Sequence, residues 1–256
     1  MAETLGGLEG IYAIWLREIK VYTREKERIV SSLVNPLLWI FAFGTGLGAN
    51  VVIPNVPVNY QHYIFPGIMV MAVLFTSVFY GMYVIWDRKL DFLKEVLVAP
   101  LSRTNVLLGK MLGGVTDSMI QACVLFAVAY LLGIPLTPYS LAVSLLTMFL
   151  IGVCMTSLGL AFGGFLSTIE SFQLVINFVV WPVFFFSGAL FPLTGLPPWL
   201  QLVTYADPLT YAVDAMRGAM FGLNVFPIWL DLAAIALFCI PAIALGSFAF
   251  SRMGKI

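Results

Sequence analysis

Three polar side chains interrupt a long apolar stretch near the middle of the chain and are the first candidates for chemistry. Asp117 follows Lys110 by about two helical turns, and Gln121 lies one turn further on the same helical face. Charged and amide groups are costly in apolar surroundings, so they mark functional candidates there. The pattern allows two roles: hydrogen bonds between helices, or the lining of a polar route through the molecule.

A second polar series recurs at helical spacing later in the chain, and its members are Glu170, Gln173, Asn177 and, continuing the line, Trp181. The same two roles apply to it. Aromatic residues crowd this stretch and an earlier one that contains Phe75 and Phe79. Such rings offer an adaptable apolar surface to a lipophilic substrate or, alternatively, pack against lipid and other helices.

The chain carries no signature of catalysis. Gly109-Lys110 lacks a glycine five positions earlier and is followed by Met111 rather than Ser or Thr, so it is not a phosphate-binding loop. Serine-hydrolase and zinc-protease motifs are also missing from the sequence. Three cysteines stand singly in apolar runs: Cys123, Cys154 and Cys239. We therefore expect no catalytic, cofactor or metal site on this chain.

Composition places these residues in a membrane. The 256 residues are 61% hydrophobic and 10% charged, whereas soluble domains are about 25% charged. Net charge is zero, so no nucleic acid partner is implied. A span needs about 20 apolar residues, and lipid favours helices because it cannot bond backbone groups. We predict one all-α integral membrane domain, 1–256, with six spans: 30–50, 63–86, 106–133, 140–166, 172–191 and 226–250.

Basic residues predict the orientation. All 13 Lys and Arg except Arg217 fall before the first span, between the second span and the first turns of the third, or after the last. Cytoplasmic loops carry the excess of Lys and Arg, so we expect both termini and the loop 87–105 in the cytoplasm of a cell with this protein in its plasma (inner) membrane. The connections 51–62, 134–139 and 192–225 then face outward.

Two cytoplasmic segments have amphipathic patterns. Residues 10–28 predict an interfacial helix whose apolar stripe is Ile11, Ile14, Trp15, Ile19 and Tyr22. A simple basic anchor for the first span is the alternative. In 87–100 the apolar residues Leu90, Leu93, Val96 and Leu97 recur at helical spacing, and Ser102 can cap the next helix. The apolar face of this second helix could meet the chain's own spans, the lipid interface or a cytoplasmic partner.

The outward segment 192–225 combines prolines with sparse charges. Its Pro197-Pro198 can start one helix, while Asp207 can cap a second helix that ends at Gly222. Asp214 and Arg217 are spaced i, i+3 and can pair. The second helix is too short to span, so we predict a re-entrant or surface helix, its polar stripe turned to water or to protein.

Two motifs resemble a known family. "SGALFPLTGLPPWLQLVTYADPLTYAVDAMRG" resembles the signature of type-two ATP-binding-cassette (ABC) membrane subunits, in particular permeases of the daunorubicin/doxorubicin efflux type and their nodulation-factor and polysaccharide-exporting relatives. "DRKLDFLKEVLVAPLSR" is similar to the family's cytoplasmic stretch between spans two and three. Together with six spans, the resemblance covers nearly the whole chain.

The resemblance implies an exporter permease that moves a lipophilic drug-like, lipid or lipid-linked glycan substrate outward. It implies a permease homodimer in lipid and a separate cytoplasmic ABC ATPase subunit that binds ATP and Mg. The helix 87–100 would couple to that ATPase through Leu90, Leu93, Glu95 and Leu97. The candidate pathway residues are Phe75, Phe79, Asn177 and Trp181. Asp214 and Arg217 would brace the exit helix. A secondary (ion-coupled) transporter and a non-transporting scaffold are the competing hypotheses.

Overall fold

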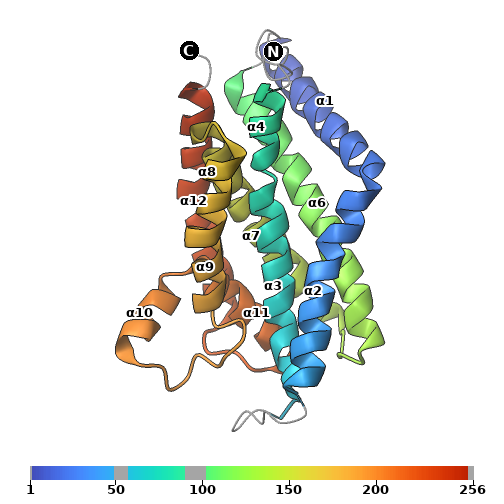
Figure 1. Cartoon of the computed structure of the whole chain (residues 1–256), viewed down its shortest axis with the longest axis vertical. Helices are drawn as coiled ribbons and strands as arrows, with labels where there is room; N and C mark the ends of the chain where they lie inside the picture. Colours follow the sequence, from blue (N-terminus) through green and yellow to red (C-terminus); the bar gives the residue numbers. More distant parts are fainter. Residues whose placement is uncertain (1, 49–56, 90–101, 253–256) are drawn as a thin grey trace.

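A computed structural model describes residues 2–48, 57–89 and 102–252, and the side chains of these ranges from Gly7 onward. All regular structure in these ranges is helical (Figure 1). Six helical segments are long and apolar enough to cross a membrane: Lys26–Gly46, Tyr60–Lys89, Arg103–Leu131, Pro138–Phe165, Ile169–Phe186 and Ile228–Arg252. The predicted fold class, an all-helical membrane protein with six spans, is confirmed.

The helices run in chain order as α1 (Ala2–Arg24), α2 (Lys26–Gly46), α3 (Tyr60–Phe79), α4 (Met82–Lys89), α6 (Arg103–Leu131), α7 (Pro138–Phe165), α8 (Ile169–Val175), η1 (Ile176–Val180), α9 (Trp181–Phe186), α10 (Pro198–Tyr205), α11 (Pro208–Phe221) and α12 (Ile228–Arg252). The second span is α3 followed by α4. The fifth is α8, the π-helical turn η1 and α9. Both are interrupted, and both interruptions lie beside the cavity described below.

Most predicted span limits are within a few residues of the observed ones. The fifth span differs most, because it ends at Phe186 rather than at 191. Gly188 takes a positive φ of 71° just beyond that end, which reverses the chain well before Pro192. The first span begins at Lys26, so Arg28 belongs to α2 and not to the N-terminal helix.

Local capping explains several helix ends. The Ser102 side chain accepts a hydrogen bond from the Asn105 N–H and starts α6, as predicted. The Asp207 side chain caps α11 by accepting from the Leu209 N–H, and Gly222 closes this helix with a φ of 69°. The two short helices predicted within 192–225 are therefore present.

The bundle has two chemically different ends. The start of α1 and the ends of α4 and α12 lie at one end, together with the start of α6 (Figure 1). We call this the basic end, since Arg17, Lys89, Arg103 and Arg252 belong to these elements. The helix α11 lies at the opposite end and packs against α7, α12 and α3. Most of this helix is buried, and the polar residues Asp214 and Arg217 are turned to protein rather than to water.

Glycines bring the two central spans into contact where α3 gives way to α4. A β-carbon on Gly81 would lie 1.8 Å from the carbonyl oxygen of Gly159 in α7, and one on Gly163 would lie 2.1 Å from the carbonyl oxygen of Gly81. Only residues without side chains permit this approach. The break in the second span is thereby held against α7.

The N-terminal helix α1 packs along α6. Ile14 and Tyr22 of the predicted apolar stripe are buried, and Trp15 Nε1 donates to Thr116 Oγ1 at 3.0 Å. Gly109 lies directly under Ile14 and leaves room for it. Part of the stripe expected to face the membrane interface is therefore used for packing within the protein.

Candidate functional site

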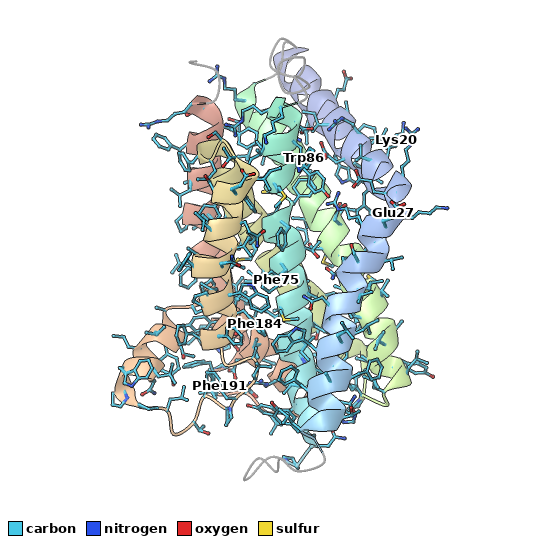
Figure 2. All side chains as sticks on the ribbon, viewed as in Figure 1. Lys20, Glu27, Phe75, Trp86, Phe184 and Phe191 are labelled. Carbon is cyan, nitrogen blue, oxygen red and sulfur yellow. The ribbon has the colours of Figure 1, made fainter. Side chains whose placement is uncertain are left out.

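A cavity of about 890 Å³ lies between the first, second and fifth spans and the C-terminal half of α1. We call it the central cavity. Its lining extends from Trp86, near the basic end, to Phe75 near the middle of the bundle (Figure 2). One wall is aromatic and apolar and the other is rich in charged and amide groups, so the cavity suits an amphipathic molecule.

Aromatic rings form the wall nearest the middle of the bundle. The rings of Phe75 and Trp181 lie 4.6 Å apart between centroids, and those of Phe75 and Phe79 6.2 Å apart. Trp39 of α2 and Phe184 of α9 stand behind Trp181, at 6.4 and 6.1 Å from it. Three of the four predicted pathway residues, Phe75, Phe79 and Trp181, thus line one cavity.

The fourth predicted pathway residue lies elsewhere. The π-helical turn η1 adds a residue to the helical repeat, and π-turns of this kind are frequent at functional sites. Gln173, Ile176 and Trp181 line the central cavity, whereas Asn177 is exposed on the surface of the span. Glu170 is also exposed. The predicted polar series therefore divides: only Gln173 and Trp181 reach the cavity.

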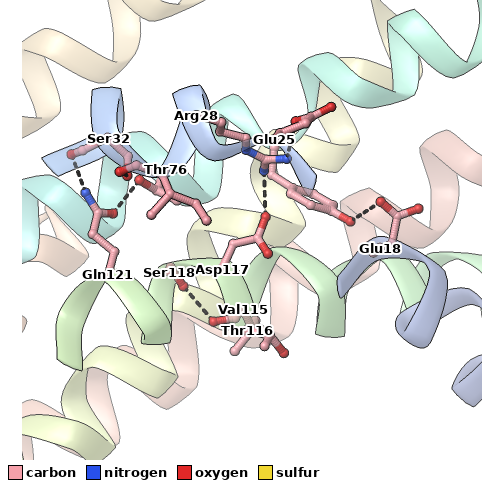
Figure 3. Close-up of polar contacts among 12 residues, drawn as sticks. Glu18, Glu25, Arg28, Ser32, Thr76, Val115, Thr116, Asp117, Ser118 and Gln121 are labelled. Carbon is pink, nitrogen blue, oxygen red and sulfur yellow. Dashed lines mark hydrogen bonds and ion pairs between the residues drawn. The ribbon is translucent and has the colours of Figure 1, made fainter. Parts of the chain in front are cut away.

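The polar wall is held by contacts between α2, α3 and α6 (Figure 3). Gln121 donates to the Ser32 carbonyl oxygen at 2.6 Å and accepts from the Thr76 hydroxyl. Arg28 binds Asp117 at 2.6 Å and Glu25 at 3.5 Å. The predicted face of Asp117 and Gln121 thus makes hydrogen bonds between helices, while Gln121 also lines the cavity.

Three tyrosine rings surround the guanidinium group of Arg28. Its central carbon lies 4.1 Å from the ring centre of Tyr83, 5.2 Å from that of Tyr22 and 5.8 Å from that of Tyr80. These distances are within the range of cation–π attraction. Arg28 therefore sits in an aromatic cage that two carboxylates close.

A buried ionic cluster ties α1, α4 and α6 together beside the polar wall. Lys110 Nζ binds Glu18 Oε1 at 3.1 Å and also Asp87 Oδ2, and Tyr80 donates to Glu18 at 2.7 Å. Burial raises the pKa of Glu18, but Lys110, the Tyr80 hydrogen bond and Arg17 outweigh burial and lower it overall. Sequence analysis missed Glu18 and Asp87. One signal was available: Glu18 lies four residues from both Ile14 and Tyr22, so it shares a helical face with the apolar stripe.

The predicted coupling residues Leu90, Leu93, Glu95 and Leu97 lie outside the described residues. Of the predicted 87–100 helix, only residues 87–89 are described, and they are helical. Residues 87–89 complete α4, where Asp87 is buried against Lys110. The segment that follows Lys89 is therefore joined directly to the second span.

Asp214 and Arg217 are both buried but bind separate partners. Both carboxylate oxygens of Asp214 accept from the Val225 N–H at 2.9 Å, and Oδ2 also accepts from the Phe226 N–H. Arg217 donates to the carbonyl oxygens of Tyr63 and Ala189, and its guanidinium lies 3.9 Å from the Tyr63 ring centre. The expected direct pair is wrong, because backbone groups of neighbouring segments occupy both side chains.

Six candidate spans, a buried short helix before the last of them and an amphipathic cavity are consistent with a membrane transport protein. The chain belongs to the ABC-2 type transporter family, whose model matches residues 9–221. It is therefore a non-catalytic, multi-pass membrane permease subunit of an ABC transporter, a class that works with an ABC ATPase partner.

Named relatives agree with this membership. The chain is 34% identical over 192 residues to the putative transport permease ycf38 of Cyanophora paradoxa. The aligned region covers 74% of this chain and 66% of that protein. It is 27% identical over 212 residues to the inner membrane transport permease YadH of Escherichia coli strain K12, covering 80% of each chain. It is 27% identical over 242 residues to nodulation protein J of Neorhizobium galegae, covering 91% and 90%.

Proposed function

We propose that this chain is the membrane subunit of an ATP-driven exporter and that the central cavity is the inner part of its transport path. The two-sided cavity carries this proposal: Phe75, Phe79 and Trp181 offer an apolar wall, while Gln121 and Arg28 offer a polar one. The apolar part of an amphipathic substrate would pack against the first wall, and its polar part would bind the second. A lipophilic drug-like molecule, a lipid or a lipid-linked glycan fits this description.

The distribution of charge supports an inward-facing basic end in the plasma membrane. Arg217 is the single Lys or Arg outside the basic segments, and its side chain is buried at the opposite end. The ATPase would then bind at residues that follow Lys89. Because α4 leads straight into that segment, movement of the ATPase would reach the second span and the cavity wall directly.

An exposed amide supports pairing with a second copy of the chain. Asn177 is exposed on the fifth span, outside the central cavity and beside exposed apolar residues such as Phe178. Amide groups are unfavourable against lipid tails, so a protein partner or water is expected over this face. Asn177→Cys should therefore cross-link two copies in a Cys123→Ser background. Leu237→Cys, exposed on α12, is the control; equal cross-linking of both would count against this interface.

Coupling is tested by replacing Leu93 with a charged residue. Leu93→Asp should abolish ATPase binding and ATP-dependent export, because a carboxylate would have to enter an apolar contact. The measurement is ATP-dependent uptake of substrate into inverted vesicles that carry both subunits, and binding is followed by co-purification. Leu202→Asp is the matched control, since Leu202 is 74% exposed on α10 at the other end of the bundle. Export that persists in Leu93→Asp, or that needs no ATPase, would overturn the proposal and favour an ion-coupled carrier.

The path is tested at Trp181. Trp181→Ala should change the relative export rates of substrates with different ring systems, because its ring forms part of the apolar wall. Trp229→Ala is the control, since Trp229 is 71% exposed on α12 and does not line the central cavity. An unchanged substrate profile in Trp181→Ala would assign this residue to packing alone.

A further inference from the structure

The surroundings of Arg28 are those of a binding site for an organic cation. Three tyrosine rings and two carboxylates enclose its guanidinium group. Aromatic cages of this kind recognise ammonium ligands through the negative faces of the rings. Here the chain's own side chain occupies the cage, at the polar end of a cavity with about 890 Å³ of space.

One buried carboxylate oxygen behind Arg28 is unsatisfied. The charged residues that line the cavity are Arg17, Glu25, Arg28 and Asp87, and Arg28 reaches Asp117 of α6 behind them. Asp117 is 1% exposed, and its Oδ1 atom has no hydrogen-bond partner in the described part of the chain. A buried oxygen of this kind is costly to leave unpaired. A cation or hydrogen-bond donor that reached Asp117 would satisfy it.

We propose that Arg28 fills a cation site in the central cavity and that a lipophilic organic cation takes its place as the transported substrate. This inference rests on the proposed function, which makes the cavity the path. The cation would lie against Tyr83 and Asp117, and its apolar body against Phe75 and Trp181. Arg28 is in the first turn of α2 and still partly exposed, so its long side chain can turn toward water when displaced.

The same contacts disfavour an anionic substrate. Arg17 already faces Glu18 and Asp87, at 2.7 and 3.6 Å, and Arg28 already faces Asp117 and Glu25. An anion would have to lie against these carboxylates or separate them from their arginines, and like charges repel strongly at low dielectric. The two arginines therefore balance the local acids rather than forming an open anion site.

Equilibrium binding to the permease in lipid nanodiscs tests the inference without the ATPase. The probes are tetraphenylphosphonium, the anion tetraphenylborate and neutral triphenylphosphine oxide, which share phenyl groups and differ in charge. We expect tetraphenylphosphonium to bind at least about tenfold more tightly than the other two. Arg28→Gln should tighten its binding by about tenfold, because the internal competitor is removed. Asp117→Asn and Tyr83→Leu should weaken it by about tenfold.

Conservative variants separate recognition from folding. Tyr83→Phe keeps the ring and should bind as the wild type does. Glu25→Gln should weaken binding by a few-fold, whereas Glu27→Gln, two residues along and outside the central cavity, should not. Equal binding of the three probes, or weaker tetraphenylphosphonium binding in Arg28→Gln, would overturn the cation site. Because this binding assay uses no ATP, failure of the cation site would not contradict the exporter proposal. Conversely, export that persists in Leu93→Asp would not change the binding result.

Discussion

The two ends of the bundle bury charged side chains in different ways. At the basic end, Lys110 lies between Glu18 and Asp87, so side chains from three helices neutralise one another. At the opposite end, Asp214 and Arg217 bind backbone N–H and carbonyl groups of the segments around α11. Charge is balanced by charge in the first case and by peptide dipoles in the second.

This difference reflects what each end has to position. In long continuous helices most backbone groups are already bonded within the helix, so contacts between side chains make most of the polar links between them. The helix α11 is flanked by irregular segments whose N–H and C=O groups need partners in an apolar setting. A buried cation or carboxylate satisfies those groups and fixes the segment. We therefore expect charge itself to matter most at the basic end, and bonding geometry at the other.

The largest effect is expected at Lys110. Lys110→Met leaves Glu18 and Asp87 buried without their shared cation, and breaking a buried pair in this way costs about 3–5 kcal/mol of unfolding free energy. Thermal unfolding in detergent micelles measures it. Lys20→Met, on the exposed side of α1, should change stability by no more than about 0.5 kcal/mol. A loss no larger than that of Lys20→Met would show that the cluster is not a structural tie.

Adding Glu18→Gln and Asp87→Asn to Lys110→Met should recover part of the lost stability. The triple variant removes the uncompensated charges together with the cation, and replaced buried pairs are often close to neutral. No recovery would mean that shape, rather than charge, decides stability at the basic end. The contrast between the two ends would then disappear.

A smaller effect is expected at Arg217. Arg217→Lys keeps the charge but replaces a planar group that bonds the Tyr63 and Ala189 carbonyl oxygens together. We expect a loss of about 1–3 kcal/mol from unmade hydrogen bonds, measured by the same unfolding assay. Arg252→Lys, at the exposed end of α12, is the matched control. If a positive charge alone were enough to stabilise this site, Arg217→Lys would be as stable as Arg252→Lys.

The smallest effects are expected in the pH dependence, where the two ends should respond with opposite sign. The lowered pKa of Glu18 adds stability above its ordinary value of 4.5, and this is lost as pH falls through the folded-state pKa. Burial raises the pKa of Asp214 above 3.8 despite hydrogen bonds from Phe226 and Val225 and the charge of Arg217, so folding gains stability as pH falls.

Melting temperatures between about pH 7 and about pH 3 measure both contributions. The melting temperature of the wild type should exceed that of Glu18→Gln by less in acid than at neutral pH. Relative to Asp214→Asn, the melting temperature of the wild type should rise in acid. Shifts of the same sign in both comparisons would contradict the assignment of charge pairing to one end and backbone bonding to the other.

Sequence reasoning predicted the spans and the two short helices of 192–225 because these depend on local signals. Apolar length set the spans, and Asp207 and Gly222 set the limits of α11. Phe75, Phe79 and Trp181 were selected because aromatic rings stand out in the pattern, and the structure places all three on the central cavity. Whether they contact substrate stays a prediction, as does the coupling role of Leu93.

The partners of charged residues could not be predicted in the same way. Glu18 meets Lys110 across 92 residues of sequence, and Arg28 meets Asp117 across 89, so helix packing decides both. Asp214 and Arg217 have ideal helical spacing, yet the helix turns each toward a different backbone segment. Asn177 was misplaced relative to the cavity because Gln173 and Ile176 face it instead, and packing rather than spacing sets how the fifth span is rotated about its axis.

The salt link among α1, α4 and α6 has a mechanical consequence. A pull or push applied beyond Lys89 meets α4 first, and the shared ammonium of Lys110 fastens that short rod to two neighbours. Load is consequently divided over three helices, instead of bending the chain at the Gly81 junction alone. The stiffness of this joint sets how far α4, and with it Tyr83, can move relative to α1 and α6.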